Sequence, residues 1–154
     1  MKLNDCLQTP AWVYQPLQPF DLDPCAGKAT EIAKTNYRLE DWDDGLADPW
    51  LGFVWCNPPF SQKELWIERM KQHDDGLLLL PERGSSAWFG SLAHHCGYYF
   101  VLGQRISFVG GSNSSSVGSV LFPFGDAAVQ RLHDSGLPGH FVDVKFFTPR
   151  KTRR

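Results

Sequence analysis

The chain has 154 residues, of which 42% are hydrophobic and 21% are charged, and its formal net charge is −2. This apolar content excludes an intrinsically disordered chain, and the length suits one compact domain, residues 1–154, with a core of its own. A charge so close to neutral gives no overall signature of nucleic-acid binding, so any such contact must come from a local basic patch. The tail over residues 149–154 offers one, although short basic tails are more often simply solvated.

The cysteines exclude two further classes of protein. They stand at positions 6, 25, 56 and 96, with no CxxC pairing and no regular spacing. Neither a disulfide framework nor a standard zinc module has this pattern, so we expect reduced thiols and no metal site. No apolar run approaches the ~20 residues that a membrane span needs. We therefore expect a soluble cytoplasmic protein with no membrane contact.

The first elements in chain order lead to an acidic turn. Thr9 and Pro10 predict the start of a short helix, with threonine at the N-cap and proline at the first helical position. A short strand is predicted over residues 20–23, and the small residues 24–27 follow it, where the backbone can approach a ligand closely. A helix is predicted over residues 28–34.

The middle of the chain predicts a strand-helix-strand unit. A polar and acidic stretch over residues 36–46 comes first, at a place where the ligand-contacting loops of α/β sheets belong. A strand is then predicted over 53–56, a helix over 63–73 and a second strand over 76–81. The second strand is continuously apolar, as expected when helices cover both faces of a sheet.

The last third predicts one more helix and further strands, over residues 86–95, 98–102, 119–124 and 141–147. The Gly/Ser-rich segment 110–116 predicts a loop between two of these strands. No internal repeat and no linker divides the chain. The whole sequence therefore predicts a single α/β domain.

A tetrapeptide directly after the apolar run at 53–56 carries the clearest chemistry: Asn57, Pro58, Pro59 and Phe60. Two successive prolines offer no N–H groups and stiffen the chain. Such a turn can aim the Asn57 side-chain oxygen and the Pro58 carbonyl at one point, with the Phe60 ring beside them to stack on a planar group. This arrangement suits the exocyclic amine of a base. Taken alone, the tetrapeptide is equally compatible with a purely structural turn after a strand.

Several elements in the same order resemble the phage-type DNA N6-adenine methyltransferases, a family of S-adenosylmethionine-dependent amino-methyltransferases. They are Thr9-Pro10, the acidic turn Phe20-Asp21-Leu22-Asp23-Pro24-Cys25-Ala26, the motif Cys56-Asn57-Pro58-Pro59-Phe60-Ser61, Trp88-Phe89 and Arg105-Ile106-Ser107-Phe108. The resemblance spans the chain from about Thr9 to Phe124. It implies a compact, trimmed Rossmann-like methyltransferase fold, because the stretch between Gly27 and Asn57 is too short for a complete Rossmann half.

The resemblance also implies site residues. The implied cofactor is S-adenosyl-L-methionine, held by Thr9, Pro10, Asp21, Asp23, Pro24, Cys25, Ala26 and Asp44. Thr9 would contact its methionine moiety and Asp23 would lie near its amino group, whereas the choice among Asp41, Asp43 and Asp44 stays open. The implied catalytic residues are Asn57, Pro58, Pro59 and Phe60. The implied nucleic-acid contacts are Ser61, Arg105, Phe108, Arg150, Lys151, Arg153 and Arg154, although Phe108 suits the core equally well.

The resemblance implies that the chain transfers a methyl group to adenine N6 in double-stranded DNA, with the base flipped out of the helix. Positioning and electrostatics suffice for this reaction, so buried packing is the expected role of Cys25 and Cys56. The same arrangement of two acceptors and an aromatic ring suits cytosine N4, an RNA base or a protein glutamine as the methyl acceptor. A non-catalytic DNA-binding module is a further alternative. We expect a monomer in a bacterial or phage-infected cell.

Overall fold

The computed structural model describes residues 8–28, 30–108 and 117–145. The helices within them are α1 (Ala11–Tyr14), η2 (Gln15–Leu17), η3 (Leu39–Asp41), η4 (Phe60–Gln62), α2 (Lys63–His73), α3 (Ala87–Cys96) and α4 (Asp126–Asp134). The strands are β1 (Leu22–Asp23), β2 (Thr35–Asn36), β3 (Val54–Cys56), β4 (Gly76–Pro81), β5 (Tyr98–Leu102), β6 (Ser119–Phe124) and β7 (Gly139–Asp143). None of the helices in these ranges is long and apolar enough to span a membrane.

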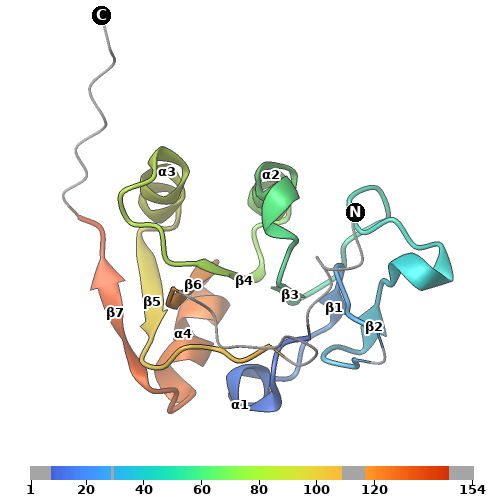
Figure 1. The fold of residues 1–154 in the computed structure, drawn as a ribbon, viewed down its shortest axis with the longest axis horizontal. Coiled ribbons are helices and arrows are strands. Elements are labelled where there is room, and N and C mark those ends of the chain that lie inside the picture. The colour runs from blue at the N-terminus through green and yellow to red at the C-terminus, as the bar shows by residue number, and fades with distance from the viewer. Residues whose placement is uncertain (1–7, 29, 109–116, 146–154) are drawn as a thin grey trace, which may run out of the picture.

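The strands form one sheet in the order β2-β1-β3-β4-β6-β5-β7. β2, β1, β3 and β4 run parallel to one another, β6 is antiparallel to β4 and β5, and β7 is antiparallel to β5. Helices α2 and α3 cover one face of the sheet, and α1 and α4 cover the other (Figure 1). The protein is therefore a mixed α/β structure, as the sequence predicts.

Strand β4 shows why a continuous apolar run is needed in the middle of this sheet. Leu77 and Leu79 belong to the core that β4 shares with α1 and α4. Leu78 and Leu80 point the other way, into the core shared with α2 and α3. Successive side chains of a strand alternate between faces, so both faces of β4 are apolar. Burying each leucine contributes about 2 kcal/mol relative to leaving it exposed.

The order of the strands contains a point where the chain reverses its direction across the sheet. From β1 the chain moves to β2 on one side, and it then returns to β3 on the other side of β1 and continues to β4. In open α/β sheets, ligands bind at such a switch point, outside the carboxyl ends of the strands. Here these ends are the turn that begins at Pro24 and the tetrapeptide that begins at Asn57.

Most of the predicted regular elements are confirmed. The helix over 63–73 and the strands over 76–81, 98–102 and 119–124 have the predicted bounds. β3 begins one residue later than predicted, and α3 begins and ends one residue later. Four of the long apolar or amphipathic segments were thus placed without error by their hydrophobic pattern. The predicted loop over 110–116 lies outside the described residues.

The helix predicted over 28–34 is wrong, since the described residues 30–34 contain no helix. β1 and β2 pair in parallel, with Leu22 opposite Thr35. The connection is shorter than the roughly twelve or more residues that a helical crossover takes. It is instead an irregular segment held by a hydrogen bond of 3.0 Å from the Lys34 N–H to the Phe20 carbonyl, with Ile32 buried.

The start of the first helix also differs from the prediction. α1 begins at Ala11 with Pro10 in the N-cap position, and no side chain caps it. Thr9 is therefore not the N-cap. Its hydroxyl instead accepts a hydrogen bond from the side chain of Asn57, so an interaction distant in sequence replaces the local one.

Two elements near the end of the chain differ as well. β7 begins at Gly139, earlier than the predicted strand over 141–147, and residues 146 and 147 are outside the described part. Helix α4 is absent from the prediction. Its signal was present, because Asp126 stands in the first turn and the buried Ala128 and Leu132 are spaced as neighbours on one helix face.

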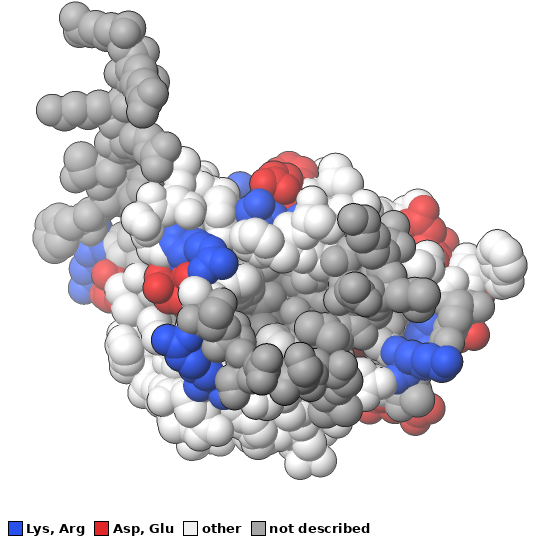
Figure 2. Space-filling model, in the orientation of Figure 1, with Lys and Arg blue, Asp and Glu red and all other residues white. Residues whose placement is uncertain are grey.

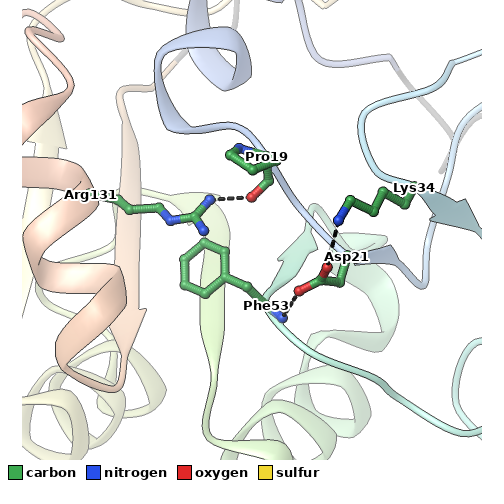
Figure 3. Close-up of polar contacts among 5 residues, drawn as sticks. All are labelled: Pro19, Asp21, Lys34, Phe53 and Arg131. Carbon is green, nitrogen blue, oxygen red and sulfur yellow. Dashed lines mark hydrogen bonds and ion pairs between the residues drawn. The ribbon is translucent and has the colours of Figure 1, made fainter.

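Arg131 fastens α4 to the segment that precedes β1 (Figure 3). Its Nη1 donates to the Leu17 carbonyl at 2.9 Å and also to the Pro19 carbonyl. The guanidinium lies 4.0 Å from the centre of the Phe53 ring, which itself stacks on Phe20. One side chain thus joins a helix near the C-terminus to the start of the parallel half of the sheet.

Candidate active site

The tetrapeptide after β3 begins where the buried strand ends. Pro58 and Pro59 are buried and Asn57 is half-buried, whereas the Phe60 ring is 41% exposed. Pro59 has an extended backbone and leads directly into η4, after which α2 begins at Lys63. The prolines therefore hold the chain in place while the next residue presents an aromatic ring to solvent.

The Asn57 side chain is oriented by Thr9. Its Nδ2 donates to the Thr9 Oγ1 at 3.0 Å, and Thr9 is only 5% exposed. Because the two polar atoms of an amide point in different directions, this bond turns the Asn57 Oδ1 away from Thr9.

Asp23 ends β1 and supports the turn that follows. Its Oδ1 accepts a hydrogen bond of 3.1 Å from the Cys25 N–H, and its backbone carbonyl accepts one of 2.9 Å from the Tyr37 N–H. The side chain is 2% exposed, and this burial raises the pKa of Asp23 to about 7 against the opposing effect of the Cys25 hydrogen bond and of Arg38. Asp23 does not line the neighbouring cavity.

A cavity of about 290 Å³ lies beyond the carboxyl ends of β1 and β2, next to η4 and α2. It is lined by Pro24, Cys25, Ala26, Tyr37, Leu39, Asp43, Asp44, Gly45, Leu46, Gln62 and Trp66. Its volume stands at the lower end of the ~300–1,000 Å³ typical of small-molecule sites. The sequence-predicted cofactor residues Pro24, Cys25, Ala26 and Asp44 meet here, whereas Thr9, Pro10, Asp21 and Asp23 do not line it.

An acidic loop forms one wall of this cavity. Asp44 Oδ1 accepts hydrogen bonds from the Leu46 N–H at 3.0 Å and the Ala47 N–H at 3.2 Å. Asp43 Oδ2 accepts one of 2.9 Å from the Arg38 N–H. Asp43 and Asp44 thus both line the cavity, whereas Asp41 does not.

Gly45 brings this loop into direct contact with the turn after β1. A Cβ at this position would lie 1.8 Å from the Pro24 carbonyl oxygen and 2.8 Å from the Trp66 ring. The backbone can therefore approach this closely only with glycine. Trp66 also carries an indole N–H that is buried without a hydrogen-bond partner in the part of the chain that the structure describes. Neither residue is among the cofactor contacts predicted from the sequence.

An aromatic–cation cluster, formed by Phe60, Lys63, Arg83 and Trp88, lies beside the tetrapeptide. The Phe60 and Trp88 rings meet edge to face, with 6.0 Å between their centres. The Lys63 ammonium lies 4.4 Å from the centre of the Phe60 ring, and the Arg83 guanidinium 5.9 Å from it. Lys63 and Arg83 are not among the nucleic-acid contacts predicted from the sequence, although Lys63 comes three residues after the tetrapeptide and Arg83 two residues after the strand over 76–81.

Basic side chains are otherwise scattered on this view of the molecule. Figure 2 shows Lys and Arg in small separate groups, several of them next to acidic side chains, rather than in one continuous patch. Ser61 and Arg105, both predicted to contact nucleic acid, are exposed. Phe108 is half-buried against the core on the α1 and α4 side, and residues 150–154 lie outside the described part.

Asp21 directly precedes β1 and does not line the cavity described above. Its Oδ2 accepts a hydrogen bond of 2.8 Å from the Phe53 N–H, and its Oδ1 is 3.6 Å from the Lys34 Nζ (Figure 3). The Phe53 N–H is the main reason why the pKa of Asp21 is lowered. Asp21 instead lines a separate hollow with Leu51 and Gly52. The structure therefore gives it contacts that hold the start of β1.

Cys56 immediately precedes the tetrapeptide, but its thiol stays protonated at neutral pH. It is fully buried, and burial, with Cys25 and Asp23 nearby, raises the pKa of its thiol well above the usual value. A thiol must ionise to act as a nucleophile, so Cys56 remains a packing residue at neutral pH. No group of three or more His, Cys, Asp or Glu side chains within the described ranges is arranged to hold a metal ion.

Comparison with known proteins agrees with this arrangement. The family model of DNA N-6-adenine-methyltransferase (Dam) matches residues 1–122. A DNA N-6-adenine-methyltransferase of Escherichia phage T1 is 25% identical over 144 residues, which cover 74% of this chain and 59% of that protein. The chain thus spans less than two thirds of the length of this relative, and no solved structure matches it. The extent of the family match shows that the chain belongs to the DNA N-6-adenine-methyltransferase (Dam) family.

Proposed function

We infer that this protein transfers a methyl group from S-adenosylmethionine to the exocyclic N6 of adenine in DNA. The observation that carries the proposal is the Asn57 amide, which is fixed by Thr9 at the end of β3 with its oxygen left to accept a hydrogen bond. The Pro58 carbonyl is the next acceptor along the chain. Family membership supports the choice of adenine N6 among the amines that such a pair of acceptors suits.

The cavity beside this motif is suited to the methyl donor. S-adenosylmethionine supplies a methyl group activated on a sulfonium. The carboxylates of Asp43 and Asp44 line the wall and offer acceptors for hydroxyl groups, and the small side chain of Ala26 allows close approach to the backbone. Trp66 contributes apolar surface to the same cavity.

The topology supports a trimmed Rossmann-like methyltransferase fold in one domain. Four parallel strands with a switch point between β1 and β3 are what a dinucleotide or nucleoside site of this kind requires. The irregular link between β1 and β2 accounts for the shortened first half. The motif at Asn57 follows β3 and the turn at Ala26 follows β1, so the two lie at the ends of neighbouring strands.

The residues of the tetrapeptide would act by position. The lone pair of adenine N6 is delocalised into the ring, which makes the amine a poor nucleophile. Hydrogen bonds from this amine to the Asn57 Oδ1 and the Pro58 carbonyl favour a tetrahedral nitrogen whose lone pair faces the methyl group. A neutral amide accepts such a bond without taking the proton, which therefore leaves to water. No covalent enzyme intermediate is required, in agreement with the protonated thiol of Cys56.

The aromatic–cation cluster provides the contacts to DNA. An adenine inside a duplex has to leave the base stack before its amine is accessible, and the exposed Phe60 ring offers a stacking surface for it. Lys63 and Arg83 place positive charge next to that ring, where the phosphates flanking a flipped base would pass. Ser61 and Arg105 remain proposed contacts to the DNA strand that carries the flipped base.

The test is transfer of tritiated methyl from S-adenosylmethionine to unmethylated duplex DNA, with the product nucleosides separated. We expect label in N6-methyladenine, its loss in Asn57→Ala, and unchanged cofactor affinity in that variant. Gln72→Ala, which removes an exposed amide from α2, is the matched control and should keep full activity. Label in cytosine would change the substrate but keep the mechanism, and full activity of Asn57→Ala would remove Asn57 from it.

A further inference from the structure

Thr9 and Asn57 are 48 positions apart in the chain and yet share a hydrogen bond of 3.0 Å. Thr9 is one of the few buried polar residues in the described part, at 5% exposure. Its hydroxyl does not cap α1, since no side chain caps that helix. Thr9 also does not line the cavity that we assign to the cofactor. The hydrogen bond with Asn57 is therefore what explains the burial of the Thr9 hydroxyl.

The chemistry of the substrate explains why this contact matters. An exocyclic amine donates hydrogen bonds, so it requires an acceptor from the enzyme. An asparagine side chain presents its oxygen in one orientation and its NH₂ group after a half-turn of the amide. In the second orientation two donors face each other, and the amine is repelled rather than held. The reaction thus depends on which way the Asn57 amide points.

We propose that Thr9 is a positioning residue, whose hydroxyl holds the Asn57 side chain through the hydrogen bond from its Nδ2, in the orientation that leaves the Oδ1 for the substrate amine. This inference rests on the proposed function of Asn57. It gives Thr9 a role different from the cofactor contact that the family resemblance implies. Because Thr9 acts on the reacting geometry, its loss lowers kcat and leaves cofactor affinity unchanged.

The decisive comparison is between Thr9→Val and Thr9→Ser. Valine has nearly the shape of threonine but no hydroxyl, whereas serine keeps the hydroxyl and loses only the methyl group. We expect kcat to fall about tenfold in Thr9→Val, as one hydrogen bond suggests, and to stay within about threefold of wild type in Thr9→Ser. The dissociation constant of S-adenosylmethionine, measured by calorimetry without DNA, should stay unchanged in both variants.

Two results would overturn the proposal. A weaker affinity for S-adenosylmethionine with an unchanged kcat in Thr9→Val would make Thr9 a cofactor contact, and an unchanged kcat and affinity would make the bond irrelevant. Where circular dichroism shows that Thr9→Val is unfolded, Thr9→Cys replaces it, because its sulfur is a weaker acceptor in a side chain of similar size. Its kcat should then fall while its cofactor affinity stays unchanged, and an unchanged kcat would again overturn the proposal.

The Asn57→Asp variant provides a second background, which separates the effect of Thr9 on the orientation of the residue 57 side chain from its effect on packing. In Asn57→Asp both side-chain oxygens are acceptors, so a half-turn no longer matters. Thr9→Val should therefore cost much less in that background, and an equal loss in both backgrounds would contradict the orienting role. A failure of the broader function looks different: wild-type protein without methyl transfer refutes the activity, and a fully active Asn57→Ala refutes the role of Asn57. An active Thr9→Val beside an inactive Asn57→Ala, or an equal loss from Thr9→Val in both backgrounds, refutes this inference alone.

Discussion

The ammonium group of Lys63 lies 4.4 Å from the centre of the Phe60 ring, at the point where the tetrapeptide turns into α2. The side chain of Lys63 is only 15% exposed and also pairs with Glu64 at 2.9 Å. The cation is thus held against the ring rather than free in solvent. A fixed positive charge beside an exposed aromatic ring is a means of holding one base and its phosphate together.

This arrangement predicts the salt dependence of DNA binding. Lys63→Gln and Arg83→Gln should each reduce the slope of log Kd against log salt by about 1, because each removes one phosphate contact. Fluorescence anisotropy between 50 and 200 mM salt, roughly the range in which such contacts dominate, measures it. Lys71→Gln, in the last turn of the same helix, is the control and should leave the slope unchanged. An equal slope in all four proteins would remove the cluster from the DNA interface.

Gly45 predicts the effect of a single methyl group on cofactor binding. In Gly45→Ala the new Cβ would stand 1.8 Å from the Pro24 carbonyl oxygen, so the acidic loop must move away from the turn after β1. We expect the affinity for S-adenosylmethionine to fall about tenfold or more, since the cavity wall is displaced. Gly118→Ala is the matched control, because its Cβ would meet Glu82 only at 3.9 Å. Equal affinities in the two variants, measured by calorimetry, would show that the loop does not bind the cofactor.

Asp23 predicts a pH dependence of stability. Burial raises its pKa from 3.8 to about 7, so between these values the folded protein keeps a proton that the unfolded chain releases. The free energy of unfolding should therefore fall as pH rises from 4 to 7, by at most about 4 kcal/mol from this group, and stay level above it. Asn at this position still accepts the Cys25 hydrogen bond, so Asp23→Asn should lack that fall. Urea titrations of both proteins at several pH values measure the difference, and parallel curves would contradict the assignment.

Arg131 predicts a stability difference between the two cations labelled in Figure 3, Arg131 and Lys34. Arg131→Met removes the bonds to the carbonyls of Leu17 and Pro19 and the contact with the Phe53 ring. We expect it to cost about 1–3 kcal/mol of unfolding free energy. Lys34→Met breaks only an exposed pair with Asp21 and should cost less than about 1 kcal/mol. Similar midpoints of urea unfolding for the two variants would show that Arg131 does not fasten α4.

The sequence predicts best those elements whose signal is local. The bounds of β4 are predictable because a strand buried on both faces is a continuous apolar run. Those of α2 are predictable because a helix buried on one face has apolar residues at helical spacing. α4 carries a local signal of the same kind, with Asp126 in its first turn and Ala128 and Leu132 on one face, and the prediction nevertheless omits it. The helix expected over 28–34 failed for a different reason, because pairing between β1 and β2 decides the length of that connection.

In the candidate site, too, the local motifs are predictable from the sequence and the contacts between distant segments are not. The tetrapeptide at Asn57 could be identified from its residues, and the turn at Ala26 from its place after a strand. Gly45 and Trp66 could not, because their contribution is a close approach between segments that only the folded chain brings together. The role of Thr9 was hidden likewise, since a threonine before proline has an ordinary explanation as a helix cap and its actual partner is distant in sequence.

The two halves of the sheet differ in how firmly they are paired. β4 and β6 are in register at every position from Gly76 opposite Phe124 to Pro81 opposite Ser119, whereas β1 is in register with β3 only at Leu22 and Val54. Amide protons of the antiparallel half should therefore exchange slowly, through global opening, and those around the switch point should exchange through smaller local openings. The half that holds the candidate site is thus the half whose protection a bound cofactor can increase most.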